Sequence, residues 1–206
     1  MSAALAFNVV ARGLPSYALR PATPVLGFAA DAEIFAEGDT ADTLYKVVSG
    51  MVRSCAFLSD GRRHIDAFHK PGDVFGFEPG AEHELSAEAV IPCTVIPYRR
   101  RALEDDTAAN LYAQALRGLS RARQHARLLG RTTAGQRIAS FLLEMVTPVG
   151  EVDLPMTRQD IADYLSLTVE TVSRNFTALE RSGAITLLSA RHLLVPCRAA
   201  LEELAL

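Results

Sequence analysis

The fold of this chain is decided by residues 157–179, which have the sequence TRQDIADYLSLTVETVSRNFTAL. Two short amphipathic helical patterns flank a tight turn in this stretch. Thr157 and Thr168 each stand where the N-cap of a helix is expected, and Asp160 follows Thr157 at the spacing of a capping box. The stretch therefore predicts two crossed helices joined by a turn near Ser166.

The two helices would pack through one apolar set and expose another face. The apolar set consists of Ile161, Leu165, Leu167, Val172, Phe176 and Leu179. The outer face of the second helix then carries Val169, Glu170, Ser173, Arg174 and Thr177, which can reach a groove of DNA. Ser166 stands at a turn position usually held by glycine, where a left-handed backbone would cost about 1 kcal/mol. The turn is therefore either strained or differently shaped.

Glu170 and Arg174 lie four residues apart on the outer face, a spacing that suits adjacent base pairs. Glutamate can accept a hydrogen bond from cytosine and arginine can donate two to guanine, each pair discriminating by roughly 1–3 kcal/mol. The alternative is an ion pair within the helix, worth about 0.2–0.5 kcal/mol. Residues 184–188 and 192–195 predict a small β-hairpin, or wing, and this context favours DNA binding.

A long helix is predicted before this region, over residues 103–129, which contain no proline. A stripe of apolar residues with heptad spacing runs along it: Tyr112, Ala115, Leu119, Ala122, Ala126 and Leu129. We expect two copies to pair in parallel along this stripe as a homodimer. The alternative is a single helix buried on its own domain. Leu111 and Leu116 lie off the stripe and are expected to pack on the N-terminal domain.

Residues 33–98 predict short strands separated by turns about every 10 residues, which favours an all-β roll or sandwich. Charge is divided along the chain. Residues 1–98 hold 7 basic and 12 acidic residues (net −5), and residues 99–206 hold 14 and 12 (net +2). Between residues 107 and 143 there are six arginines and no acidic residue, which indicates either a positive patch or a solvated helix face.

Several functional classes are disfavoured by the sequence. No apolar stretch reaches the roughly 18 residues of a membrane span and no leader pattern is found, so we expect a cytoplasmic protein without a membrane partner. Cys55, Cys93 and Cys197 form neither a disulfide framework nor a zinc motif. We find no enzyme motif. Glu84 and Glu88, four residues apart, are expected to be surface charges rather than paired catalytic carboxylates.

The chain from about residue 32 to residue 195 resembles the Crp/Fnr superfamily of bacterial regulators. The matching motifs are Glu37-Gly38-Asp39, Leu44-Tyr45-x-Val47, Gly50-x-Val52, Gly61-Arg62 and Phe68-x-x-Pro71-Gly72-Asp73-x-Phe75-Gly76. The resemblance implies an α+β protein with three parts. These are a cyclic-nucleotide-binding-like β-roll (residues 1–102), a dimerisation helix (103–130) and a winged helix-turn-helix (131–206).

Residues 170–174 resemble the recognition signature of the Fnr and FixK branches, and residues 75–78 with 86–90 are similar to FixK. The resemblance implies a palindrome similar to TTGAT, four bases, ATCAA, read by Glu170, Ser173 and Arg174. It also implies phosphate contacts from Thr157, Arg158, Gln159, Thr168 and Thr171, with Arg191 in the wing as a weaker candidate. The resemblance further implies a transcriptional activator that contacts RNA polymerase and controls low-oxygen or respiratory genes.

The expected roll lacks the ligand groups of its sensing relatives, so no cofactor is predicted. Residues 83–87, HELSA, offer no arginine for the phosphate of a cyclic nucleotide, although Glu78 is present. Three cysteines are too few for a four-thiolate iron-sulfur cluster. His64, His69 and His83 leave haem, or another small effector, as an open alternative. Cys93 is expected in a buried strand, and Cys197 is a candidate redox site.

Overall fold

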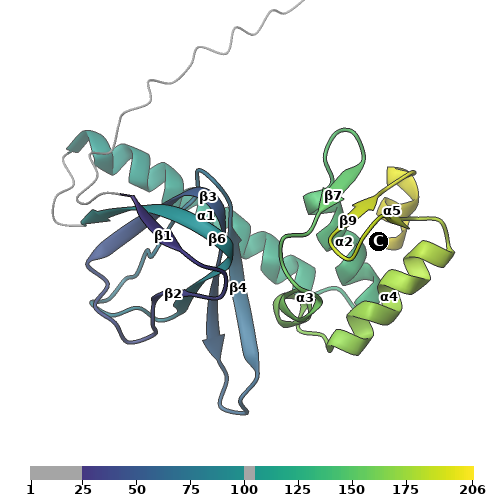
Figure 1. Cartoon of the computed structure of the whole chain (residues 1–206), viewed down its shortest axis with the longest axis horizontal. Coiled ribbons are helices and arrows are strands. Elements are labelled where there is room, and N and C mark those ends of the chain that lie inside the picture. Colours follow the sequence, from purple (N-terminus) through teal and green to yellow (C-terminus); the bar gives the residue numbers. More distant parts are fainter. Residues whose placement is uncertain (1–24, 100–104) are drawn as a thin grey trace, which may run out of the picture.

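The computed structural model describes residues 25–99 and 105–206, with the side chains of residues 105–111 outside that description. A β-sheet domain and a small domain of helices with a three-stranded sheet lie at opposite ends of one long helix (Figure 1). The predicted α+β architecture is confirmed. Some predictions concern parts of the chain that the structure does not describe. These are the predictions for the N-terminal segment, for the side chain of Leu111 and for the start of the long helix at residues 103–104.

The N-terminal domain is a six-stranded antiparallel roll. Its strands are β1 (Leu26–Phe28), β2 (Glu33–Phe35), β3 (Thr43–Phe57), β4 (Arg63–His69), β5 (Val74–Phe75) and β6 (Ser86–Arg99). The long strands β3 and β6 pair with register shifts around Gly50. Gly50 has φ +78°, and a Cβ there would lie 2.4 Å from the carbonyl oxygen of Pro92, so no other residue fits this close approach. The resulting irregularities curve the sheet around its core.

The long helix α1 (Asp105–Leu129) runs from the roll to the C-terminal domain (Figure 1). Most of the predicted stripe is exposed on the single chain, with Leu129 half-buried. The expectation that Leu116 packs on the roll was wrong, because this side chain is 46% exposed. Among the α1 side chains that the structure describes, the buried ones are His125 and Leu128, near the C-terminal end. Among the described helices, none combines the length and apolarity that crossing a bilayer requires.

The C-terminal domain holds four helices and a small sheet. Its elements are α2 (Ala134–Met145), β7 (Glu151–Asp153), α3 (Arg158–Leu165), α4 (Val169–Arg181), β8 (Thr186–Leu187), β9 (His192–Leu194) and α5 (Arg198–Leu204). The predicted wing is present as β8 and β9, and β7 adds a third strand that the sequence did not predict. A helix at α5 was not predicted either. Its Leu201 is fully buried in the core that α2, α3 and α4 share.

Candidate nucleic-acid interface

The turn between α3 and α4 is set by local hydrogen bonds. Thr157 and Asp160 cap α3 reciprocally: the Asp160 amide donates to Thr157 Oγ1 (3.1 Å), and the Thr157 amide donates to the Asp160 carboxylate (2.9 Å). Thr168 Oγ1 accepts from the Thr171 amide (3.2 Å) at the start of α4. Ser166 adopts φ 52° and ψ 48°, so the strained form of the turn is the one present.

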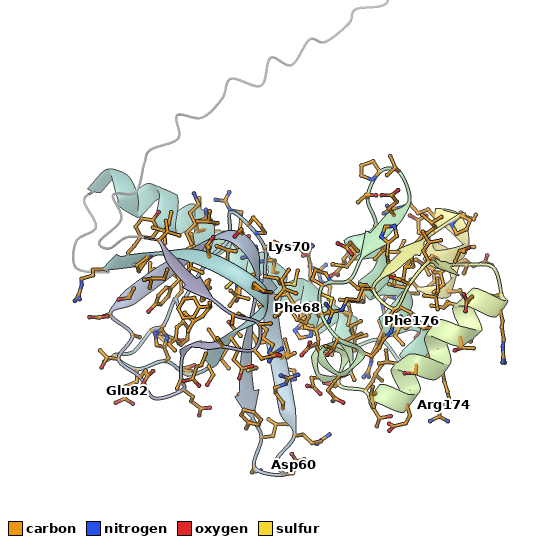
Figure 2. The ribbon with its side chains drawn as sticks, viewed as in Figure 1. Asp60, Phe68, Lys70, Glu82, Arg174 and Phe176 are labelled. Atoms are coloured by element: carbon orange, nitrogen blue, oxygen red, sulfur yellow. The ribbon has the colours of Figure 1, made fainter. Side chains whose placement is uncertain are left out.

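The outer face of α4 presents polar side chains to solvent. Glu170, Ser173, Arg174 and Thr177 are exposed, while Phe176 is buried on the opposite face. Figure 2 shows Arg174 directed away from the protein and Phe176 directed into it. Glu170 and Arg174, both among the described residues, are not ion-paired with each other; Arg174 Nε donates to the Glu170 carbonyl oxygen (3.3 Å). The charged groups of the outer face are therefore available to a partner.

The predicted phosphate contacts cluster at two helix N-termini. Thr157 and Gln159 are exposed at the start of α3, and Thr168 is exposed at the start of α4, where Thr171 is half-buried. Backbone amides and the helix dipole favour an anion at such positions. Two of the side-chain donors are used within the chain, since Thr157 Oγ1 donates to Asp160 (2.8 Å) and Gln159 Nε2 donates to Asp163 (2.7 Å).

Arg158 is placed differently from the other phosphate candidates. Its guanidinium lies 3.4 Å from the centroid of the Phe176 ring, a cation-π contact. Nη1 has no hydrogen-bond partner among the described residues. Burial lowers the pKa of Arg158 to about 10. A phosphate oxygen in contact with this side chain would accept a hydrogen bond from Nη1, which has no other partner within the part of the chain that the structure describes.

The face of α3 that points toward the roll contacts it through charged side chains. We call this group the interdomain charge cluster; its members are Arg53, Arg63, Glu88, Asp160, Asp163 and Asp31. Arg53 projects from β3 and binds Asp160 (3.1 Å), Glu88 (2.6 Å) and Asp31 (3.0 Å). Its side chain is only 6% exposed, and that of Asp160 only 2%. Hydrogen bonds to Glu88 and the nearby carboxylates raise the pKa of Arg53 against the opposing effect of burial.

Arg63 supplies the second cation of this cluster from β4. Its Nε lies 2.8 Å from Asp163, and its other nitrogens reach Asp160 and Glu88. Glu88 was expected to be a surface charge, and that prediction was wrong: its side chain is 18% exposed and binds Arg53. The sequence analysis missed the cluster. Its one local signal was an arginine inside the otherwise small and apolar run of residues 51–56.

The other end of α3 is held by aromatic packing. The ring of Tyr164 stacks on that of His125 from α1, with centroids 3.9 Å apart and planes 1° apart. His125 Nε2 lies 2.7 Å from the Tyr164 carbonyl oxygen. Phe68 from β4 lies against the same tyrosine ring (5.2 Å), and Arg137 donates to the carbonyl of Leu165 (3.2 Å). Burial lowers the pKa of His125 and raises that of Tyr164.

A cavity of about 870 Å³ lies between the roll, α1 and the C-terminal domain. Arg121 from α1 lines it and is paired with Asp73 at 2.6 Å. Glu78, the residue shared with nucleotide-binding relatives, lies 3.4 Å from His83. Of the two cationic side chains that line the cavity, Lys70 and Arg121, the arginine is thus already paired with a carboxylate.

The three histidines considered for haem are engaged in packing. His83 stacks on Phe35 with ring centroids 3.7 Å apart, and His64 lies 6.0 Å from the ring of His125. His69 Nε2 bonds Ser54 at 2.8 Å, and burial together with nearby Arg121 lowers the pKa of His69 to about 4. These contacts favour structural roles over axial ligation.

The three cysteines differ in solvent exposure. Cys55 and Cys93 are buried, as expected for Cys93, and desolvation raises the pKa of Cys55 to about 11. Cys197 is exposed at the N-cap position of α5. Its role as a redox site stays a prediction.

Comparison with known proteins agrees with these features. Residues 136–204 match the Crp-like helix-turn-helix domain, and residues 25–108 match the cyclic nucleotide-binding domain. The chain is 45% identical over 196 residues to "Nitrogen fixation regulation protein FixK" of Azorhizobium caulinodans, covering 88% of this chain and 79% of that protein. It is 35% identical to "Transcriptional activator protein FnrL" of Cereibacter sphaeroides, covering 81% and 74%.

The solved structure of FixK2 from Bradyrhizobium japonicum has a TM-score of 0.83 to this chain at 43% identity, covering 89% of this chain and 97% of that one. The prediction that the chain is not an enzyme is confirmed by these relatives, which are named as regulators.

Proposed function

This chain is a DNA-binding transcription regulator of the Crp/Fnr family, similar to its FixK members, and we propose that it binds as a dimer to a palindrome similar to TTGAT, four base pairs, ATCAA. The observation that carries this proposal is the outer face of α4, where Glu170, Ser173 and Arg174 are exposed. These residues would read the TTGA core of each half-site. The exposed position of Arg174 suits two hydrogen bonds to guanine, and Glu170 can accept one from cytosine.

Register on the DNA would come from phosphate contacts at the two helix N-termini. Thr157, Gln159, Thr168 and Thr171 would supply hydroxyl and amide donors there, with Thr157 and Gln159 exchanging their bonds to Asp160 and Asp163 for bonds to phosphate. Arg158 would join them by turning from Phe176 toward a phosphate oxygen. Such contacts strengthen binding to every sequence alike, so discrimination stays with the three side chains on α4.

We propose that the dimer forms through the α1 stripe. Tyr112 and Leu119 are large apolar side chains left exposed on the single chain, and water-exposed apolar area of this kind favours association. Two-fold pairing along α1 would place the recognition helices about 34–36 Å apart, in successive major grooves. Light scattering of Leu119→Glu should show loss of the dimer, whereas Leu116→Glu, equally exposed at 46%, should keep it.

We further propose that the roll acts as a scaffold without a bound cofactor. The pairing of Arg121 with Asp73 and the packing of the histidines support this. The protein would act in the cytoplasm as an activator in contact with RNA polymerase. Its target genes would be those of low-oxygen or respiratory metabolism, as its resemblance to the Fnr and FixK branches implies. An absorbance spectrum with a Soret band, or a nucleotide-dependent rise in melting temperature, would contradict the scaffold role.

The test of the whole proposal is fluorescence anisotropy of the purified protein, without added ligand, against the labelled palindrome and a scrambled duplex at near-physiological salt. Tight binding to the palindrome alone is expected. Binding to neither duplex would overturn effector-free recognition of this site, and equal binding to both would overturn sequence-specific readout by α4.

A further inference from the structure

We propose that Arg53 and Arg63 are positioning residues that fix the orientation of the helix-turn-helix on the roll and thereby the half-site spacing that the dimer accepts. The inference rests on the proposed function for its DNA readout. It concerns the interdomain charge cluster, whose members come from β3, β4, β6 and the turn between β1 and β2 of the roll, and from α3 of the C-terminal domain.

The first step is that these charges specify one docked arrangement. Arg53 and Asp160 are almost completely buried, yet they lie 107 residues apart in the chain and in different domains. A buried charge without its partner is strongly unfavourable. Any rotation of the C-terminal domain would separate Asp160 from both arginines, so the cluster selects the arrangement in which all its members are paired.

The second step is that α3 is held at two separated points. Asp160, in the first turn, binds both Arg53 and Arg63, whereas Tyr164 stacks on His125 near the C-terminal end of the helix. Stacked rings alone would still permit rotation about their common normal. The arginines remove that freedom through Asp160, which lies four residues, or about one helical turn, before Tyr164.

The third step concerns the link to the dimer. Residues 130–133 join α1 to α2 and most of this short segment is exposed, so the domain is oriented by side-chain contacts on either side of it: Leu128 packs in the C-terminal core, and the cluster binds α3 to the roll. Because α3 packs directly against α4, the docking of α3 sets where α4 is presented. One base pair more in the spacer moves a half-site by about 3.4 Å and rotates it by about 35°. A fixed domain cannot follow that change, and a released domain can.

The variants follow from the geometry of the Arg63–Asp163 pair. Arg63→Asp places a carboxylate among Asp160, Asp163 and Glu88 and should release the domain. The double variant Arg63→Asp with Asp163→Arg restores an opposite-charge pair across the same interface. Arg62→Asp is the matched control, since this neighbouring arginine is 77% exposed and pairs only with Asp60 at the hairpin tip that Figure 2 labels.

The first measurement is anisotropy against palindromes with spacers of three, four, five and six base pairs. The wild-type protein and Arg62→Asp should prefer one spacing by about tenfold or more, because a misplaced half-site forfeits its base contacts. Arg63→Asp should bind all four within about threefold of one another, and the double variant should regain the preference. A folded Arg63→Asp dimer with the wild-type preference would overturn the inference. So would the same loss in Arg62→Asp.

The second measurement needs no DNA. Spin labels on the exposed Cys197 and on Ser59→Cys report the distance between the domains by pulsed electron resonance, with the labelled chain diluted into unlabelled chain. A narrow distribution is expected for the wild-type protein and the double variant, and a broad one for Arg63→Asp. Equal widths would overturn the inference. If the wild-type protein binds no duplex, the proposed target is wrong, and this distance alone decides the role of Arg63.

Should Arg63→Asp fail to fold, Arg63→Gln takes its place, because it removes the cation without adding repulsion. It must broaden both the spacing preference and the distance distribution relative to Arg63→Lys, which keeps the charge. Identical behaviour of the glutamine and lysine variants would overturn the inference.

Discussion

The two helices of the helix-turn-helix use the same residue types in opposite ways. Helix α3 turns Asp160 and Asp163 toward the roll, where each carboxylate meets an arginine and little water. Helix α4 turns Glu170 and Arg174 toward solvent, with no ion pair between them among the described residues. The carboxylates of α3 are committed within the chain, whereas Glu170 and Arg174 of α4 are available to another molecule. The same charged residue types are therefore suited to positioning in α3 and to recognition in α4, because they differ in burial and in ion-pair partners.

We expect the largest difference between α3 and α4 in how substitution of their carboxylates changes the free energy of unfolding. Asp160→Ala removes a buried carboxylate that binds two arginines and caps α3, so we expect a loss of about 3–5 kcal/mol in the free energy of unfolding. Glu170→Ala removes an exposed carboxylate of α4 and should stay within about 0.5 kcal/mol of the wild-type protein. Urea titration followed by circular dichroism measures both. Similar losses would show that the two faces do not differ as described.

Acid should weaken the side of the roll that holds α3. His69 lies on β4, the strand that carries Arg63, and its pKa is lowered to about 4 by burial and by Arg121. Between about pH 6.5 and pH 4 the unfolded chain binds this proton more readily than the folded protein. The stability contributed by neutral His69 is therefore full above about pH 6.5 and falls by about 3 kcal/mol toward pH 4.

The matched measurement compares unfolding of the wild-type protein with that of His69→Gln across this range. The variant should lack the part of the pH dependence that belongs to His69. Parallel curves would rule out a contribution from this residue. Residues 169–181 of α4 contain no histidine, so no comparable loss is expected from the recognition face.

Substitution on α4 should affect discrimination and leave stability nearly unchanged. Arg174→Ala should remove about 1–3 kcal/mol of base discrimination in each half-site, since it would delete the proposed contact with guanine. Arg158→Ala, at the N-terminus of α3, should instead weaken binding to all sequences alike. Anisotropy with the palindrome and with single base-pair substitutions distinguishes the two. Equal losses on specific and random DNA for both variants would contradict the assigned roles.

The smallest expected effect lies in the turn that joins the two helices. Ser166 is a non-glycine residue in the left-handed region, so Ser166→Gly should raise the free energy of unfolding by up to about 1 kcal/mol. Ser182→Gly is the control, because Ser182 follows α4 with φ −76° and gains nothing from glycine. Thermal unfolding that ranks the two variants equally would remove the case for strain at the turn.

The features that could be predicted from the sequence are those with local causes. Thr157, Asp160 and Thr168 cap their helices through residues three positions away, and the apolar period of residues 157–179 is complete within that stretch. The exposed face of α4 follows from the same period. A strand as short as β7 has no period to detect, and its pairing with β9 joins residues about 40 positions apart.

The interdomain charge cluster could not be predicted for the same reason. Arg53 meets Asp160 at a separation of 107 residues, and Arg63 meets Asp163 at 100. Nothing adjacent to Glu88 distinguishes it from Glu84, so its burial depends on how the two domains dock. The burial of α1 was misassigned at Leu116 because the apolar contact of that helix lies at His125 and Leu128, beside the C-terminal domain.

Asp160 carries an evolutionary constraint. The same carboxylate closes the capping box with Thr157 and binds both roll arginines, so a change at this position disturbs a helix terminus and a domain interface at once. Single substitutions at these positions should therefore be disfavoured, and we expect positions 53, 63 and 160 to vary together or not at all among homologues. An alignment of related chains would show this coupling as covariation between strands of the roll and the first turn of α3.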